Sequence, residues 1–365
     1  MDVIIAIDSW KGCLTSSEAN EAARRGVLTR WPDAKVQCFP MSDGGEGFLD
    51  AVEPTGSYQR VTIDALDPLM RPIKADYLYS PPKEGVGGGL AVIEMAQASG
   101  LHLLKPDERN PLVASSYGTG QLIADALQRG ATDIVVGLGG SATSDCGMGM
   151  LEALVERGHS SIPQSLNITI ATDVTNPLLG PNGATYIFAP QKASPSLSPE
   201  ALSAMLSELE TRSVAFALAN ASPAYDYSQE PGAGAAGGVG YALMQYYGAR
   251  RISGAEFIIS QTLQTLPLPS AGSTDGEPFL IITGEGRADR QTLMGKLPYA
   301  ILQKTKSLDI PVILLAGQVR DRQALLDAGF SQVLCVNPPD SPLEECIRPD
   351  MAATRITGTI KHITI

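Results

Sequence analysis

The chain has 365 residues, of which 44% are hydrophobic, so it is too apolar for a disordered protein and long enough for two domains. Its 39 acidic and 27 basic residues give a formal net charge of -12, which argues against a general nucleic-acid binder. The 37 glycines, about one residue in ten, indicate many positions where the backbone turns sharply or approaches another group closely.

The cysteine pattern and the N-terminal residues favour a reducing compartment. The five cysteines are scattered and form no CxxC pair, which argues against a zinc site of the usual spacing. The first residues contain no basic segment, and their apolar run ends at Asp8, unlike a signal peptide. No apolar stretch approaches the ~18–20 residues that cross a bilayer. We therefore expect a cytoplasmic protein that binds neither membranes nor nucleic acids.

The first sixty residues have the element order of a doubly wound α/β sheet. Residues 3–7 form an apolar β-branched run, typical of a strand buried on both faces. Thr15 and Glu18 have the spacing of a helix capping box, and the helix should end before Pro32. A second strand is expected at 36–40. This strand–helix–strand order predicts a parallel sheet.

The same order of elements resumes near residue 279, after a middle region whose predicted elements follow a different order. In the middle region, strands are expected at 58–66, 73–79 and 90–94, and a helix is expected at 116–129. Strand-to-loop junctions are expected at 133–143 and 168–177. A surface loop is expected at 193–200 and a connector at 266–278. In the last part, strands are expected at 278–287, 310–317 and 332–338, with helices near 296–308 and 320–328 and one more in the tail. We predict that residues 1–60 and 279–365 form one domain, into which residues 61–278 are inserted as a second α/β domain.

Loops at the ends of the predicted strands carry charged residues among glycines. In open α/β sheets, ligands bind outside the carboxyl ends of the strands. Lys11 follows the first strand and precedes a helix N-terminus, where an anion is favoured. Asp43 and Glu46 stand among three glycines, an arrangement that suits Mg²⁺. The alternatives are a solvated loop with a capped helix and a tight turn with solvated carboxylates.

Two further loops in the middle region are candidates for binding an anion or a metal. Gly139, Gly140 and Ser141 could cradle an anion with backbone amides and a hydroxyl, and Asp145 could be a metal ligand or a base. Asp173 ends the next strand. The alternative for both loops is close packing at a strand–helix junction.

The last candidate loop places one cation between two carboxylates. Arg287 lies between Glu285 and Asp289, and its guanidinium could hold a carboxylate substrate bidentately. The alternative is a surface ion pair, which contributes little energy. Lys192, in the segment PQK, is a weaker candidate for the same site.

Several familiar motifs are absent or incomplete. The run GAGAAG at 232–237 matches GxGxxG, but Pro231 and polar residues precede it instead of a strand, so packing at a helix start is favoured. Lys296 follows Gly295 but lacks the upstream glycine of a Walker A motif. No HRD or DFG signature of protein kinases occurs.

Eight segments taken together closely resemble the type I bacterial glycerate kinases. They occur in the order DSWKGCLTS, MSDGGEG, ERNPLVASSYGTG, GLGGSATSDCGMGML, TDVTNPLLGPNGAT, FAPQK, PGAGAAGG and TGEGRADRQTLMGKLP. The resemblance covers about residues 1–320. It implies a discontinuous flavodoxin-like (Rossmann-like) domain with a second α/β domain inserted, and an active site in the cleft between the two domains.

The resemblance also implies a reaction, in which the γ-phosphoryl group of ATP is transferred to D-glycerate, usually at the 2-hydroxyl, with ATP bound as its Mg²⁺ complex. The expected catalytic residues are Lys11, which would neutralise phosphate charge, and Asp43 and Asp173, of which one would orient or deprotonate the hydroxyl. The expected substrate-binding residues are Gly139, Gly140, Ser141, Lys192 and Arg287. The expected Mg²⁺ ligands are Asp145 and Glu285. We expect a monomer or a homodimer.

The chain departs from the family pattern at a few positions, and none of them removes a charged motif residue. Trp10 and Cys13 replace Phe and Ser, Ser144 and Cys146 flank Asp145 in place of Asn and Gly, and Ala193 replaces a Gly. The segment after residue 158 is also shorter than the pattern. Three alternatives remain open: a kinase of another small hydroxy acid, a non-catalytic sensor of a nucleotide or organic acid, and a nicotinamide-dependent reductase that rests on GAGAAG alone.

Overall fold

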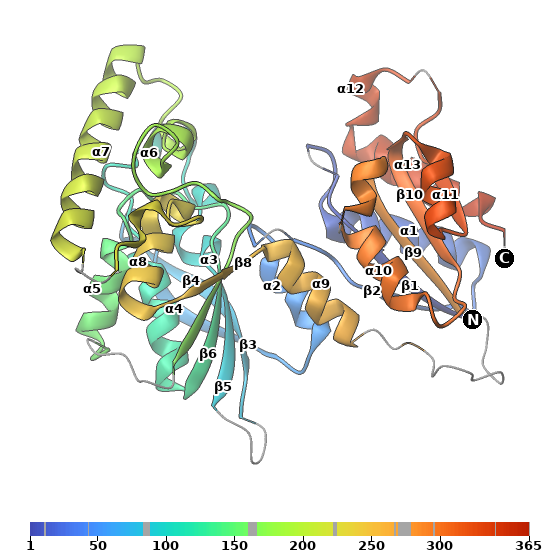
Figure 1. Ribbon diagram of the computed structural model, residues 1–365, viewed down its shortest axis with the longest axis horizontal. Coiled ribbons are helices and arrows are strands. Elements are labelled where there is room, and N and C mark those ends of the chain that lie inside the picture. Colours follow the sequence, from blue (N-terminus) through green and yellow to red (C-terminus); the bar gives the residue numbers. More distant parts are fainter. Residues whose placement is uncertain are drawn as a thin grey trace. The chain divides into compact units, whose positions relative to one another are not determined.

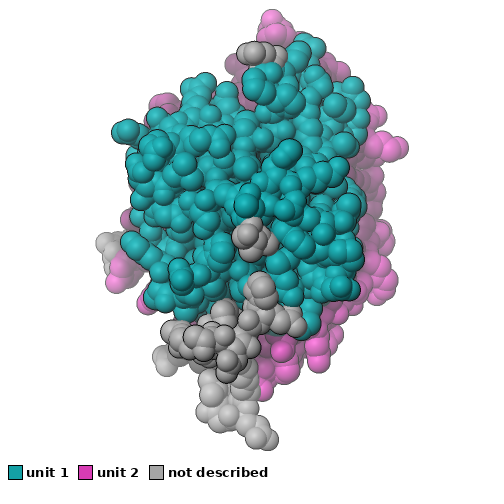
Figure 2. Space-filling model, turned by 90° about the vertical axis from the view of Figure 1, so that its right-hand side faces the viewer, with its two compact units in different colours: residues 1–42, 50–56, 258–365 teal, residues 43–49, 57–257 magenta. Residues whose placement is uncertain are grey.

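The computed structural model has a mixed α/β fold with two separate sheets, as the sequence predicts. It describes residues 1–10, 12–42, 44–82, 88–159, 166–221, 225–265, 268, 279–294, 296–339 and 341–364. The chain divides into two compact units (Figure 2). Unit 1 comprises Met1–Ser42, Asp50–Gly56 and Ile258–Ile365, and unit 2 comprises Asp43–Leu49 and Ser57–Phe257. In the described part of the chain, no helix combines the length and the apolar character that a membrane span requires.

Unit 1 is built on a fully parallel sheet with the strand order β11-β10-β9-β1-β2 (Figure 1). Its strands are β1 (Asp2–Ile7), β2 (Lys35–Cys38), β9 (Phe279–Ala288), β10 (Val312–Val319) and β11 (Gln332–Cys335). Its helices are α1 (Ser16–Arg30), α10 (Leu297–Thr305), α11 (Arg322–Ala328), α12 (Leu343–Cys346) and α13 (Pro349–Thr359). Val3, Ile5 and Ile7 pack with α1 and α13 on one face of the sheet, and Ile4 is buried on the other. This double burial explains the continuous apolar run of β1.

The predicted capping box starts α1 as expected. The Thr15 side chain accepts a hydrogen bond from the Glu18 backbone amide, and the Glu18 carboxylate accepts one from the Thr15 amide at 2.8 Å. The helix ends at Arg30, before Trp31 and Pro32. Because the cap satisfies amides that a helix start leaves without partners, it fixes where the loop after β1 ends.

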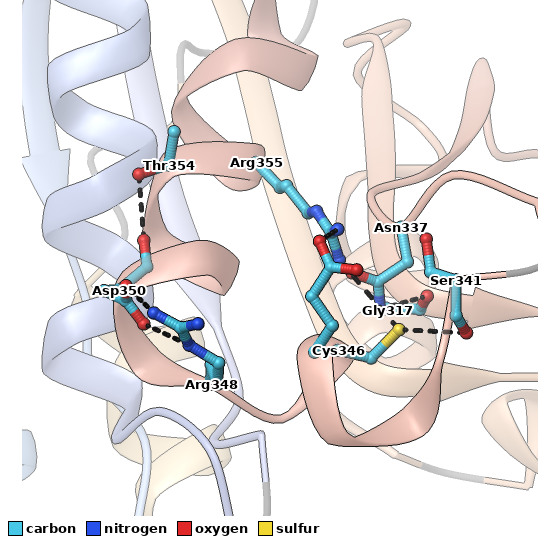
Figure 3. Close-up of polar contacts among 9 residues, drawn as sticks. Gly317, Asn337, Ser341, Cys346, Arg348, Asp350, Thr354 and Arg355 are labelled. Carbon is cyan, nitrogen blue, oxygen red and sulfur yellow. Dashed lines mark hydrogen bonds and ion pairs between the residues drawn. The ribbon is translucent and has the colours of Figure 1, made fainter.

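A polar cluster attaches the C-terminal helices to the sheet of unit 1 (Figure 3). Arg355 on α13 donates to the Asn337 side chain at 3.0 Å and pairs with Glu345. The Asn337 amide in turn donates to the Gly317 carbonyl oxygen at 3.0 Å, near the end of β10. The cluster thus links α12 and α13 to the carboxyl end of β10.

Unit 2 is built on a mixed sheet with the strand order β3-β4-β5-β6-β7-β8. Its strands are β3 (Gln59–Leu66), β4 (Pro72–Ser80), β5 (Gly89–Glu94), β6 (Ala131–Gly137), β7 (Asn167–Ala171) and β8 (Arg250–Ile252), and β5 to β8 run parallel. Its other elements include α3 (Ala96–Ser99), α4 (Tyr117–Gln128), α5 (Met148–Glu156), α6 (Ala184–Phe188), α7 (Pro199–Asn220) and α8 (Val239–Tyr247). The unit boundaries fall within α2 (Phe48–Val52) and α9 (Gly254–Thr265).

Most expected strands are present within a few residues, but several helices were not predicted, among them α5, α7 and α9. Helix α7 buries Met205, Leu209, Ser213 and Ala217, but Val214 and Leu218 are exposed, so the apolar residues of its sequence do not form a single stripe. The GAGAAG run is buried directly before α8, and a Cβ on Gly237 would lie 2.1 Å from the Thr143 carbonyl oxygen. This contact supports the packing interpretation. The expected connector 266–278 lies, apart from residue 268, outside the described residues.

Candidate active site

In unit 1, polar side chains gather at the carboxyl ends of β1 and β9. Asp8 follows β1, and its backbone amide donates to the Gly284 carbonyl oxygen at 2.9 Å, which holds it beside Glu285 on β9. The Glu285 side chain is buried, and its two oxygens accept hydrogen bonds from Thr292 and from Lys296, the latter at 2.7 Å. One buried carboxylate is thus held by a hydroxyl and by a half-exposed ammonium group.

The environment of Glu285 disfavours its charge despite these partners. Burial raises the pKa of Glu285, and the nearby charge of Asp8 raises it further, while the hydrogen bonds from Lys296 and Thr292 act in the opposite direction. Buried carboxylates beside a like charge occur at functional sites more often than in ordinary cores, because the arrangement is costly to the fold. Glu285 is therefore the candidate of unit 1 whose surroundings are most typical of a functional residue.

Arg287 lies on the same strand, where its guanidinium pairs with Asp289. The Nε–Oδ2 distance is 3.0 Å, and the Arg287 side chain is about half exposed. Asp289 also accepts a hydrogen bond from the Gln291 amide at 2.8 Å, so its position is fixed by the following turn. The Arg287 side chain is therefore accessible at the surface although its partner Asp289 is buried, so a substrate carboxylate can reach the guanidinium.

In unit 2, three loops at strand ends meet through glycine backbone. The Gly139 amide donates to the Gly44 carbonyl oxygen at 2.9 Å, so the loop after β6 contacts the 44–47 loop. Gly44 has φ +92°, and a Cβ there would lie 2.5 Å from the Ala171 carbonyl oxygen at the end of β7. These contacts explain the glycines in both segments, because any side chain would separate the loops.

Replacing Gly139 with alanine should push these loops apart. The new Cβ would lie 2.3 Å from the Gly45 Cα. The nearest atoms all belong to the backbone, so no flexible side chain can move away to make room for it. We expect a loss of about 1–3 kcal/mol in the free energy of unfolding and a lower kcat/KM, measured by urea denaturation and steady-state kinetics. Gly358→Ala is the matched control, because its Cβ would meet open space. Equal behaviour of the two variants would show that the loop contact is unimportant.

Asp145 caps the beginnings of two helices. Its carboxylate accepts hydrogen bonds from the Ser116 amide and hydroxyl, at 2.8 and 2.7 Å, and from the amides of Gly147 and Gly149, at 3.1 and 3.2 Å. Ser116 precedes α4, and Gly147 and Gly149 begin α5. The four donors join α4 to α5 through one carboxylate, so a metal ion at Asp145 would have to share its oxygens with them.

The substitution Asp145→Asn distinguishes the helix-capping role of Asp145 from its expected role as a metal ligand. The amide side chain presents N–H groups where the carboxylate accepts, so we expect a loss of about 1–3 kcal/mol in the free energy of unfolding, measured by denaturant titration. If Asp145 only caps the helices, the Mg²⁺ concentration at half-maximal activity stays that of the wild type. A shift of that concentration by tenfold or more, without a stability loss, would instead favour the metal role.

Asp173, at the end of β7, is exposed and lies at the start of α9. Its Oδ1 accepts hydrogen bonds from the Ser253 hydroxyl and from the Gly254 amide, the latter at 3.1 Å. Glu94 ends β5 and is buried, and its carboxylate accepts hydrogen bonds from the amides of Gly47 and Leu49. Glu94 at the end of β5 and Asp173, two residues after β7, therefore each accept hydrogen bonds from the beginning of another segment.

Lys192 is buried beneath the loop that follows β6. Its Nζ donates to the Ser141 hydroxyl at 2.9 Å and to the Thr143 carbonyl oxygen at 2.7 Å. The structure thus brings Lys192 together with Ser141, Gly140 and Gly139 in one loop region of unit 2. It brings Glu285 together with Arg287 on one strand of unit 1. The expected catalytic residues Lys11 and Asp43 lie outside the described residues.

A family model and the sequences of known proteins agree on what this chain resembles. The model of the glycerate kinase family matches residues 3–161 and 155–364, which is nearly the whole chain. The chain belongs to the glycerate kinase family. It is therefore an enzyme, a kinase, as its eight segments predict.

Relatives of this glycerate kinase family member match over almost their full length. A glycerate kinase of Bacillus subtilis (strain 168) is 36% identical and covers 100% of this chain and 97% of the relative. A glycerate 2-kinase of Escherichia coli (strain K12) is 37% identical and covers 93% of this chain and 92% of the relative. A crystal structure from Salmonella typhimurium LT2, assigned as glycerate kinase 2, is 32% identical with a TM-score of 0.71 and covers 99% of this chain and 96% of that chain.

Three residues at the candidate sites of this family member were not singled out in the sequence. Lys296 and Thr292 hold Glu285, and Glu94 holds the start of α2. Lys296 belongs to a segment that carries the resemblance, but its own sequence context indicates only an incomplete Walker A motif and predicts no contact with Glu285. Glu94 carried a usable signal, because it is a charged residue that directly ends a buried strand.

Proposed function

We propose that the chain transfers the γ-phosphoryl group of ATP to the 2-hydroxyl of D-glycerate and forms 2-phospho-D-glycerate. The observation that carries the proposal is the buried Glu285, held by Lys296 at the carboxyl end of a parallel strand, in a chain that belongs to the glycerate kinase family. The similarity to a relative named glycerate 2-kinase supports the position of transfer.

The proposed roles follow from what phosphoryl transfer requires, which is positioning and charge neutralisation more than covalent chemistry. Lys11 neutralises phosphate charge as the transition state forms. Asp43 or Asp173 orients or deprotonates the glycerate hydroxyl. Arg287 binds the glycerate carboxylate after leaving Asp289, and the Gly140 amide with the Ser141 hydroxyl binds an anionic group. The Gly139 amide is already donated to the Gly44 carbonyl oxygen, so Gly139 supports the loop and does not bind the anion as expected from the sequence.

The carboxylates of unit 1 fit a Mg²⁺ ion that arrives with ATP. Among the residues that the structure describes, no three His, Cys, Asp or Glu side chains form a metal-binding group. A Mg²⁺–ATP complex needs only one or two protein carboxylates, because phosphate oxygens and water complete its shell. Asp8 and Glu285 lie close enough for the charge of one to raise the pKa of the other, an unfavourable pairing that a cation relieves. The ion would neutralise phosphate charge there, and Asp145, with its four donors, fits this role less well.

The finer details of fold and assembly are part of the same proposal. Counted along unit 1 alone, the strand order of its sheet is 2-1-3-4-5, which is the order of a flavodoxin-like domain. We propose that this domain comprises residues 1–60 and 279–365 and that residues 61–278 form the inserted domain. We also propose a cytoplasmic monomer or homodimer with D-glycerate and ATP as its small-molecule partners.

A coupled assay of ADP release tests the proposed substrate. The enzyme with ATP and Mg²⁺ should give its highest kcat/KM with D-glycerate among D-glycerate, L-glycerate, tartronate and lactate. A higher value with another acid would identify a kinase of a different hydroxy acid. Binding of ATP without turnover of any of the four would instead favour a non-catalytic sensor.

A further inference from the structure

Lys192 is a buried lysine whose amino group meets one loop at two points. Only 4% of its surface is exposed, and it ends the short turn Pro190–Lys192 that follows α6. Its Nζ reaches the Ser141 hydroxyl and the Thr143 carbonyl oxygen, which lie on either side of Ala142 in the loop after β6. The Lys192 side chain therefore holds two positions, Ser141 and Thr143, of the loop that is proposed to bind an anion.

The surroundings of Lys192 suit a neutral amine. Within the described ranges, Nζ has the Ser141 and Thr143 oxygens as its hydrogen-bond acceptors, and the two hydrogens of a neutral amine match them. Burial lowers the pKa of Lys192 to about 7, against the charge of Asp145, which raises it. An apolar side chain would fill the same space without this cost, so the two hydrogen bonds are what the lysine adds.

The direction of the first hydrogen bond determines what Ser141 can do. Because Lys192 donates to the Ser141 oxygen, the serine keeps its own hydrogen free to donate elsewhere. A hydroxyl that accepts one hydrogen bond also becomes a stronger donor in the next one. Ser141 lies directly after Gly139 and Gly140 and is only 7% exposed, so its hydrogen can reach an anionic group only where that group contacts this loop directly.

We infer that Lys192 is a positioning residue for phosphoryl transfer, which fixes the loop at residues 141–143 and orients the Ser141 hydroxyl as a donor to the bound anionic group. The inference rests on the proposed function, in which this loop binds phosphate or the glycerate carboxylate. Lys192 acts through Ser141, because among the described residues its Nζ donates to the Ser141 hydroxyl and to the Thr143 carbonyl oxygen. This role differs from the direct substrate contact expected of it from the sequence.

A double-mutant cycle of Lys192→Met and Ser141→Ala tests this route, with ATP, Mg²⁺ and D-glycerate as substrates. Each single variant should lower kcat/KM for D-glycerate by about 10- to 100-fold. The kcat/KM of the double variant should be no more than about threefold below that of the worse single variant. Both changes remove the same donor, which is the oriented Ser141 hydroxyl. Additive losses, or a Lys192→Met enzyme with wild-type kcat/KM, would overturn the inference. Lys74→Met, on an exposed lysine of the same unit, is the matched control and should change nothing.

Two further measurements separate this inference from the proposed function and from a loss of folding. Lys192→Gln keeps a neutral group with two hydrogens, so it should recover part of the activity that Lys192→Met loses, and a lack of any recovery counts against the inference. Hydrogen exchange of the amides at 138–145, without substrate, should be faster in Lys192→Met than in the wild type. If exchange is faster in Lys192→Met but the wild-type protein does not phosphorylate glycerate, the proposed function is refuted and the loop contact is retained. Unchanged exchange with unchanged activity would refute the positioning role.

Discussion

Glu285→Gln should lower kcat/KM for glycerate phosphorylation by about 100-fold or more while the protein stays folded. The glutamine has nearly the shape of the glutamate and can still accept a hydrogen bond from Thr292. It no longer provides the negative charge that holds Lys296 at 2.7 Å, nor the carboxylate proposed for Mg²⁺. Steady-state kinetics with both substrates varied would measure the loss.

The same substitution should not destabilise the protein at neutral pH. The folded-state pKa of Glu285 is raised, so the folded protein holds this proton to a higher pH than the unfolded chain, and stability falls as pH rises through that range. Glutamine removes this penalty. The free energy of unfolding of Glu285→Gln, relative to wild type, should therefore increase from pH 4 to pH 7 in urea titrations.

Glu344→Gln is the matched control for both measurements, because Glu344 is an exposed glutamate of the same unit. It should leave kcat/KM and the pH dependence of stability at their wild-type values. A Glu285→Gln enzyme within threefold of wild-type kcat/KM would contradict the functional assignment of Glu285. Such a result would leave the ion pair with Lys296 as a purely structural contact.

The second large effect concerns stability, because Lys192→Met should alter how the free energy of unfolding depends on pH. The pKa of Lys192 is lowered to about 7 in the folded state from the ordinary lysine value of 10.5. Between these two values the unfolded chain binds a proton that the folded protein does not, so wild-type stability rises with pH. The stability of wild type relative to Lys192→Met should rise by up to about 1.4 kcal/mol per pH unit above pH 7.

Below pH 7 this difference should become constant, since Lys192 is then protonated in both states. Urea titrations of both proteins at several pH values between 6 and 9.5 would give the difference directly. The exposed Lys74→Met should follow the wild-type curve throughout this range. Parallel curves for wild type and Lys192→Met would show that the lysine keeps its ordinary pKa in the folded protein.

Glu285 and Lys192 are both ionisable side chains that are buried in the fold. Glu285, on β9, and Lys192, beneath the loop after β6, are both held where burial disfavours their charged forms, and both are proposed to act in phosphoryl transfer. Proteins tolerate such costs at functional sites more often than in ordinary cores. Removing either group should therefore cost activity while relieving the fold of a desolvated charge.

Local sequence patterns predict individual helices and strands, but they do not predict contacts between residues that are distant in the sequence. The capping box at Thr15 predicted where α1 begins, and the β-branched run predicted β1, because both signals lie within a few residues. The roles of Asp145 depend on Ser116, 29 residues earlier, and no local pattern reveals that contact. Lys192 and Ser141 are likewise separated by 51 residues. The sequence identified these residues as candidates, and the fold determines which of them meet.

The measurement that tests the central claim most directly is ³¹P NMR of the product formed from ATP, Mg²⁺ and D-glycerate. It distinguishes 2-phosphoglycerate from 3-phosphoglycerate and detects ADP in the same spectrum. We predict signals of 2-phospho-D-glycerate and ADP in equal amounts. A spectrum that shows 3-phosphoglycerate would contradict the proposed position of transfer, and one that shows only unreacted ATP would contradict the proposed reaction.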